Sequence, residues 1–195
     1  MATIQLTGIA VTNTTPATVT AFALEWSPPV AAGSRVSKVI MTKFYDAATE
    51  PLAAKPIPPH GSVTLPYAGG VQSAPRVPAV LFATGASWGD AVWIGRITNR
   101  RAYMQQSLVA VLADLTAAAA SVTTTRQSLI TQFQSAQTAE QVSSADGDQR
   151  ACIHTVRGIV LMNLQGPVPL KDVIAHEIGA LQARLTAVQA NAVGQ

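Results

Sequence analysis

The chain has 195 residues, of which 48% are hydrophobic and 12% are charged, about half the charged fraction of a typical soluble domain. This composition excludes intrinsic disorder, which requires low hydrophobicity and high net charge. A net charge of +3 is too small for a dedicated nucleic-acid-binding protein. No stretch approaches the roughly 18 consecutive apolar residues of a membrane-spanning helix. Cys152 is the only cysteine, so an intramolecular disulfide is also excluded.

The N-terminal sequence does not resemble a secretory signal peptide. Residues 1–5 contain no basic start, no apolar segment and no small-residue cleavage site. Two explanations stay open. The protein is made and used without export, or a signal peptide was removed and Met1 was added afterwards.

The residues before about 98 predict β-strands. Short apolar runs are separated there by proline and glycine, a pattern typical of antiparallel sheets. Within one run, Phe22, Leu24 and Trp26 share a face, which predicts a sheet with one face in a core. The stretch 50–60 contains four prolines and predicts an extended surface loop or edge. The predicted strands are 4–12, 19–26, 36–45, 61–67, 76–84 and 91–97.

The residues after 98 predict amphipathic helices. Apolar residues recur there at spacings of three, four or seven, as on one face of a helix. The first stripe predicts one helix over 99–135, or two helices broken near the weak helix formers at 122–125. Further helices are predicted over 149–163 and from a cap at Asp172. The first stripe consists of Met104, Leu108, Val111, Leu115, Val122, Leu129 and Phe133.

Together these patterns predict an α+β protein with two domains. Residues 1–97 are expected to form an antiparallel, Ig-like β-sandwich. Residues 98–195 are expected to form a C-terminal helical hairpin or three-helix region. Stripes as regular as those on the helices are expected to pack on each other, on the sandwich, or on a second copy of the chain.

One short motif matches that of serine hydrolases. Gly85-Ala86-Ser87-Trp88-Gly89 fits the G-x-S-x-G nucleophile elbow, and Asp114 and then His154 or His176 follow in the order of α/β-hydrolases. The elbow requires a strand before the serine and a helix after it, whereas residues 90–94 read as a strand. A hairpin loop accounts for the same five residues. We therefore predict no catalytic residue and keep the hydrolase as an alternative.

The sequence predicts neither a metal site nor a cofactor. His176-Glu177 begins like the zinc motif H-E-x-x-H, but Ala180 stands where the second histidine is needed. On a helix, Cys152 and His154 would point about 200° apart. Asp146-Gly147-Asp148 lacks the remaining ligands of a calcium loop and predicts a turn with helix-capping aspartates.

Four residues are candidates for an interaction surface. Trp88 lies in a predicted loop, where an exposed indole acts as a binding anchor. Arg96, Arg100 and Arg101 form the only basic cluster of the sequence. We expect a salt bridge between this cluster and Asp90, with a subunit contact or a weak anion site as the alternative.

Two segments resemble Ig-like sandwich modules of exported bacterial proteins. In the segment 8–22, a strand ending in Asn13-Thr14 turns into a second strand that carries core residues. Pro58-Pro59-His60-Gly61-Ser62 is similar to a later loop of such modules. The resemblance covers about the first half of the chain and implies adhesion or assembly outside the cytoplasm. We recognise no family resemblance in the helical half.

The function we predict is therefore non-catalytic. It is binding or assembly at the bacterial cell surface or in the periplasm, through a protein partner or self-association at the helical stripes of 99–135 and 172–193. Nucleic acid is not an expected partner. A virion or extracellular filament subunit made without a signal peptide is an alternative, in which case cytoplasmic synthesis without export also stays open.

Overall fold

The computed structural model describes residues 7–28, 39–50, 54–67, 73–144 and 146–192. The chain forms two compact units, the first ending at Ile97 and the second comprising Thr98–Ala192. The fold is α+β, with antiparallel sheets in the first unit and the helical portion C-terminal.

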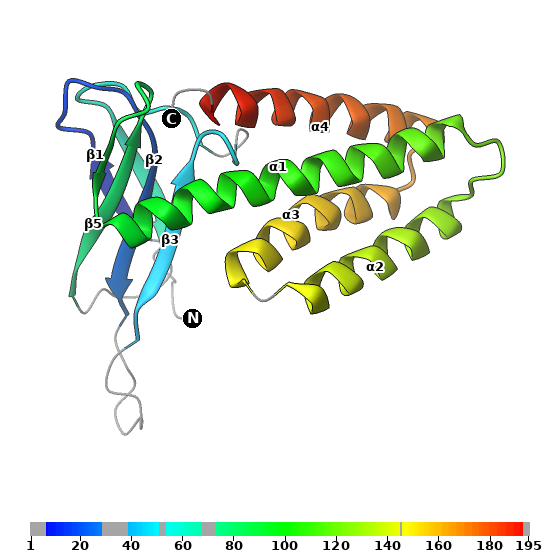
Figure 1. Ribbon diagram of the computed structural model, residues 1–195, viewed down its shortest axis with the longest axis horizontal. Coiled ribbons are helices and arrows are strands. Elements are labelled where there is room, and N and C mark those ends of the chain that lie inside the picture. Colours follow the sequence, from blue (N-terminus) through cyan, green and yellow to red (C-terminus); the bar gives the residue numbers. More distant parts are fainter. Residues whose placement is uncertain (1–6, 29–38, 51–53, 68–72, 145, 193–195) are drawn as a thin grey trace, which may run out of the picture. The chain divides into compact units, whose positions relative to one another are not determined.

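The described residues of the first unit form two antiparallel sheets (Figure 1). The smaller sheet pairs β1 (Thr7–Thr12) with β4 (Ser62–Tyr67). The larger sheet has the order β3-β2-β5-β6 and consists of β3 (Met41–Asp46), β2 (Val19–Ser27), β5 (Ser73–Phe82) and β6 (Ser87–Gly89). Strand β1 matches residues 7–12 of the strand predicted over 4–12. Residues 4–6 and 36–38 of two predicted strands lie outside the described residues. Strand β6 was expected to be part of a loop.

Strand β2 is buried on both faces, whereas the sequence predicted one buried face. Phe22 and Leu24 pack in a cluster with Tyr45 and Leu65, between the two sheets. On the opposite face, small alanines pack with Ile97 and with half-buried aromatic residues. The second face is buried because the beginning of a helix covers it, and alanine side chains allow a close approach.

The predicted strand over 91–97 is wrong, because these residues belong to that helix. Helix α1 (Ala91–Ala120) already begins at Ala91. The Asp90 side chain accepts a hydrogen bond from the Val92 N–H at 2.7 Å, and the Asp90 carbonyl accepts one from Ile94 at 3.0 Å. This is the geometry of a helix N-cap. The apolar run therefore continues as a helix, with Ile97 fully buried on its inner face.

The described residues after Asp90 form four helices, not the predicted hairpin or three-helix region. After α1 come α2 (Arg126–Ser143), α3 (Gly147–Leu164) and α4 (Leu170–Ala192) (Figure 1). A single helix over 99–135 is wrong, and the predicted break is confirmed because α1 ends at Ala120. Thr125 is the N-cap of α2, where it forms a capping box with Ser128.

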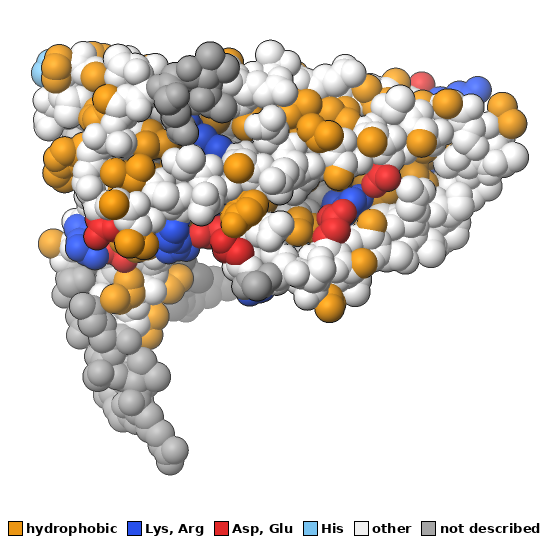
Figure 2. Space-filling view, viewed as in Figure 1, with side chains coloured by type: hydrophobic (Ala, Val, Ile, Leu, Met, Phe, Trp, Pro, Cys, Tyr) orange, Lys and Arg blue, Asp and Glu red, His pale blue; other side chains and the backbone are white. Residues whose placement is uncertain are grey.

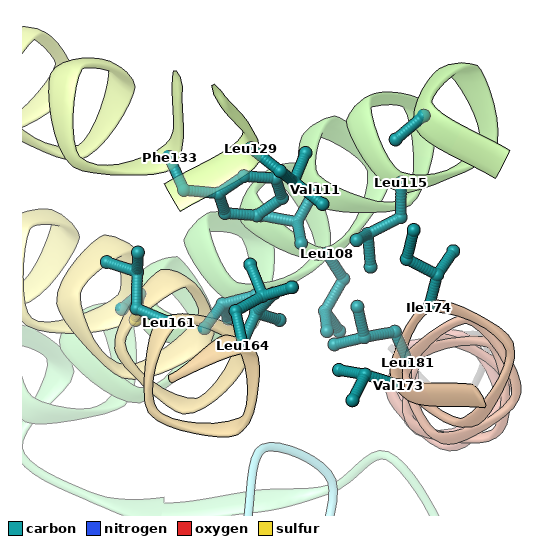
Figure 3. Close-up of a cluster of buried hydrophobic side chains, with 14 of the residues drawn as sticks. Leu108, Val111, Leu115, Leu129, Phe133, Leu161, Leu164, Val173, Ile174 and Leu181 are labelled. Carbon is teal, nitrogen blue, oxygen red and sulfur yellow. The ribbon is translucent and has the colours of Figure 1, made fainter. Parts of the chain in front are cut away.

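The predicted helical stripes meet inside this second unit. The buried residues of these stripes are each at most 9% exposed and form one hydrophobic cluster (Figure 3). The cluster joins residues of all four helices, among them Leu108, Val111, Leu115, Leu129, Phe133, Leu164, Ile174 and Leu181. These side chains are therefore buried against one another within the chain, and a partner would have to contact other surfaces. Val122, expected in the stripe, is instead fully exposed in the connection between α1 and α2.

The face of the molecule in Figure 2 carries mostly uncharged polar and apolar side chains, in line with the low charged fraction. Within the described part of the chain, no helix combines the length and hydropathy that crossing a membrane would require.

Candidate functional site

An aromatic row crosses the larger sheet and ends at Trp88. The strand register places Phe22 of β2 opposite Tyr45 of β3 on one side and opposite Val80 of β5 on the other. Val80 in turn lies opposite Trp88 of β6. Residues directly opposite each other in antiparallel strands project from the same face. The row therefore reads Tyr45, Phe22, Val80 and Trp88 along one face of the sheet.

Burial decreases sharply along this row. The rings of Tyr45 and Phe22 stack at 5.0 Å and are 5% and 1% exposed. Val80 is only partly buried, and the Trp88 side chain is 61% exposed. The smaller sheet thus covers the β3–β2 side of the larger sheet and leaves the β5–β6 side open. An indole with this exposure, adjoining an apolar sheet face, is suited to bind a ligand or partner.

The uncovered part of the sheet forms the floor of an apolar groove. Its volume is about 500 Å³, within the range of natural ligand pockets. None of the described residues that line it carries a charge. We call it the β1–β6 groove; it is lined by Val11, Thr12, Asn13, Thr14, Thr15, Val19, Phe22, Ile57, Val77, Val80, Phe82, Ser87 and Trp88.

One wall of the β1–β6 groove is formed by the end of β1, Val11 and Thr12, and by the turn that follows it. Residues of β1 line the groove, but none of β4 does, so the groove lies on the side of β1 away from β4. Among the described residues, β1 pairs with β4 alone. The groove therefore lies between an unpaired strand edge and the exposed β5–β6 side of the larger sheet.

Asn13 fixes the end of this wall. Its Nδ2 donates to the carbonyl oxygens of Ala17 at 2.8 Å, Pro58 at 3.0 Å and Ile57 at 3.1 Å. Its Oδ1 accepts hydrogen bonds from the Thr15 backbone and hydroxyl. The side chain is 6% exposed, so its amide is buried and fully engaged. It joins the turn after β1 to the segment around Ile57 and keeps both in place at the groove.

The hairpin between β5 and β6 holds Trp88 on the opposite wall. Phe82 N–H donates to the Ala86 carbonyl, and Asp90 N–H donates to the Pro78 carbonyl, both at 2.9 Å. Gly89 lies between these bonds with φ of 111°, and a Cβ there would come within 2.1 Å of the Pro78 oxygen. Only glycine fits this position without a shift of the backbone.

The arginine cluster does not form the predicted salt bridge with Asp90. Arg100 pairs with Asp148 at 3.1 Å, while the Asp90 carboxylate caps α1. Arg96 lies over the rings of Trp93 and Phe44, at 4.6 and 5.0 Å from their centroids. Arg101 is 5% exposed. Because α1 begins at Ala91, the three arginines lie beyond its first turn, where the helix dipole opposes them less.

The hydrolase motif takes a different geometry from a nucleophile elbow. A helix does follow the motif, contrary to the sequence prediction, but it begins at Ala91. Ser87 itself is a paired residue of β6, opposite Leu81. Asp114 accepts a hydrogen bond from Arg157 at 2.9 Å. His154 and His176 are exposed side chains of α3 and α4. The structure therefore shows no hydrogen-bonded triad among these described residues.

Asp146 and Cys152, which were weighed as metal ligands, take other roles near α3. Asp146 caps α3 by accepting from the Asp148 N–H at 2.8 Å, as predicted from the sequence, and it also accepts from the Tyr103 hydroxyl at 2.9 Å. The hydrogen bond to this carboxylate raises the pKa of Tyr103. Burial raises the pKa of the Cys152 thiol to about 11. Among the described residues, no three histidine, cysteine or acidic side chains are close enough to hold a metal ion.

Sequence reasoning proposed Trp88 as a candidate interaction residue but missed the groove beside it. The missing information was that β1 pairs with β4 and β2 with β5, because this pairing decides which strands are uncovered. One sequence signal was present. Strand β1 contains no proline and no charged residue, in contrast to Lys43 in β3, Pro66 in β4 and Pro78 in β5.

A second hollow, of about 1040 Å³, lies in the second unit at the end of α1 and the beginning of α4. Lys171 and Asp172 are among its lining residues, and none of the described residues that line it is aromatic. The groove at Trp88 has the stronger features of a binding site.

Comparison of the chain with protein-family models, with curated proteins and with solved structures gave no match.

Proposed function

We propose that this chain is a non-catalytic binding protein and that the β1–β6 groove is its binding site. The observation that carries the proposal is the row from Tyr45 to Trp88, in which a continuous apolar face passes from a closed core into an open groove. Exposing a large indole next to partly buried Val80 costs solvation free energy, which burial under a partner would recover. Aromatic side chains in such positions are common centres of binding energy.

The chemistry of the groove restricts what can bind there. The described residues of its walls provide apolar side chains, hydroxyl groups, one amide and backbone, and none of them is charged. Burying a charged group against such walls would be unfavourable because no ion pair would compensate for its lost hydration. The ligand surface that enters the groove is therefore apolar or neutral.

The place and purpose of this binding follow from the resemblance to Ig-like modules of exported bacterial proteins. That resemblance supports adhesion or assembly at the bacterial cell surface or in the periplasm. The burial of the helical stripes within the second unit moves the proposed contact surface from the helices to the groove.

The proposal is tested with N-phenyl-1-naphthylamine, a neutral apolar dye whose fluorescence rises in apolar sites. We expect saturable binding to the wild-type protein and loss of binding in Trp88→Ala. Val92→Ala is the matched control, since Val92 is 70% exposed in the same unit but does not line the groove. Equal dye binding by wild type and Trp88→Ala would show that the groove is not the apolar binding site.

A further inference from the structure

The unpaired edge of β1 carries hydrogen-bonding groups of known direction. Asn13 directly follows β1, and its N–H donates to Gly61 while its carbonyl accepts from His60, so Asn13 faces the β4 side. Backbone direction alternates along a strand, so the odd-numbered residues of β1 face β4 and the even-numbered residues face the opposite edge. Pro66 agrees with this assignment, because it has no N–H and lies opposite Gly8. Gly8, Ala10 and Thr12 therefore direct their N–H and carbonyl groups to the outer edge.

Within the described part of the chain, this edge lacks the devices that usually prevent strand pairing. Natural edge strands are protected by charged residues, prolines, bulges or covering segments. Strand β1 has the sequence Thr-Gly-Ile-Ala-Val-Thr, with a regular register and no charge or proline. Gly8 and Ala10 are exposed, and no described residue forms a hydrogen bond across this edge.

We propose that the occupant of the β1–β6 groove is a single extended peptide segment that pairs with β1 as an added strand. This inference rests on the proposed function and names its partner class. The backbone of the segment would bond to Gly8, Ala10 and Thr12. Its alternate side chains, which are uncharged and apolar, would point into the groove against Val80 and Trp88.

The two-layer geometry favours a lone segment over a second folded copy of the chain. Strands β5 and β6 continue beneath the place where the new strand would lie, so they already supply the second layer there. A second copy that offered its own β1 would bring its larger sheet into the same space. An extended segment has no such layer, and its inward side chains would fill the open part of the core.

A single substitution at Ala10 tests pairing at the outer edge of β1. Ala10→Pro removes an N–H that faces the outer edge and takes no part in pairing with β4, so the variant is expected to fold normally. Ala10→Thr is the matched control, since it keeps the N–H and has good strand propensity. The thermal unfolding of both variants is compared with that of the wild type before binding is measured.

The probe is a soluble synthetic peptide in which three valines alternate with threonines between terminal lysines. We expect it to change the fluorescence of Trp88 and to bind at least about tenfold more weakly to Ala10→Pro than to Ala10→Thr or the wild type. N-methylation of either all valines or all threonines removes the N–H groups of one edge of the peptide. One of these two peptides should lose binding and the other should keep it.

Three results would overturn the inference. The first is peptide binding by a folded Ala10→Pro variant at wild-type affinity. The second is dye binding in the groove without any peptide binding, which would leave the proposed function standing and remove the strand pairing. The third is a wild-type dimer in sedimentation velocity that Ala10→Pro abolishes, which would make a second copy the occupant. Absence of both dye and peptide binding would instead contradict the proposed function itself.

Discussion

Arg157 of α3 donates a hydrogen bond to Asp114 of α1 at 2.9 Å, and its guanidinium also binds both carboxylate oxygens of Glu140 in α2. The arginine is 3% exposed, whereas the two carboxylates are 30% and 35% exposed. Its guanidinium also lies 5.4 Å from the centre of the Phe133 ring. Burial by itself lowers the pKa of Arg157, but the hydrogen bonds to Glu140 and Asp114 outweigh it and raise the pKa. One buried cation thus connects three helices of the second unit.

This difference in burial between the arginine and the carboxylates predicts which removal lowers the free energy of unfolding more. Arg157→Met leaves two carboxylates that water can still reach, and we expect a loss of about 1–3 kcal/mol in the free energy of unfolding. The double variant Asp114→Asn/Glu140→Gln leaves the positive charge buried without a counterion, and we expect a larger loss of about 3–5 kcal/mol. Urea denaturation measures the free energy of unfolding of both variants. A larger loss for Arg157→Met than for the double variant would contradict the role of the buried charge.

The helical half of the fold was largely predictable from sequence. Spacings of three and four residues identified Leu108, Val111 and Leu115 as core residues, and all three are fully buried. Such spacing is a local signal, because the buried face of a helix is set by residues close in sequence. The weak helix formers near Val122 also marked the real break between α1 and α2.

The beginning of α1 and the candidate site were not predictable in the same way. Residues 91–94 are an apolar run that suits a strand or a helix equally, and the Asp90 cap decides for the helix. The groove depends on the pairing of β1 with β4 and of β2 with β5, which joins residues about 50 or more positions apart, such as Thr12 with Ser62. Only this pairing shows that the edge of β1 and the β5–β6 side of the sheet are uncovered.

Gly89 should be intolerant of any side chain, in contrast to a nearby glycine. Gly89→Ala places a Cβ against the Pro78 carbonyl at a φ of 111°, and we expect a loss of about 2–4 kcal/mol together with weaker dye binding in the groove. Gly95→Ala is the control. No heavy atom lies within 4 Å of its added Cβ, and alanine favours the helix, so it should stabilise the protein by about 0.5–1 kcal/mol. Similar effects of the two substitutions would show that the hairpin is not held as described.

Ser87 should not react as an activated nucleophile. It is a paired strand residue in a hairpin, and the Asp114 carboxylate is already bound by Arg157. We expect a fluorophosphonate probe to label the wild-type protein no more than it labels Ser87→Ala. Labelling of the wild type that disappears in Ser87→Ala would revive the hydrolase alternative.

The Cys152 thiol should make stability fall at alkaline pH. Its folded-state pKa of about 11 lies above the ordinary thiol value of 9.0, because burial opposes the thiolate. The folded state therefore holds this proton more tightly than the unfolded state does. Below about pH 8 both states are protonated and the thiol contributes no pH dependence. Between about pH 9 and 11 the unfolded state is stabilised by ionisation of the thiol, so the free energy of unfolding should decline, by at most about 1.4 kcal/mol per pH unit.

Denaturant unfolding of the wild type and of Cys152→Ala across this range isolates the contribution of the thiol to stability, since tyrosines and lysines titrate in both proteins. Parallel pH profiles for the two proteins would contradict the raised pKa, as would alkylation of the native thiol by iodoacetamide at the rate of an exposed cysteine.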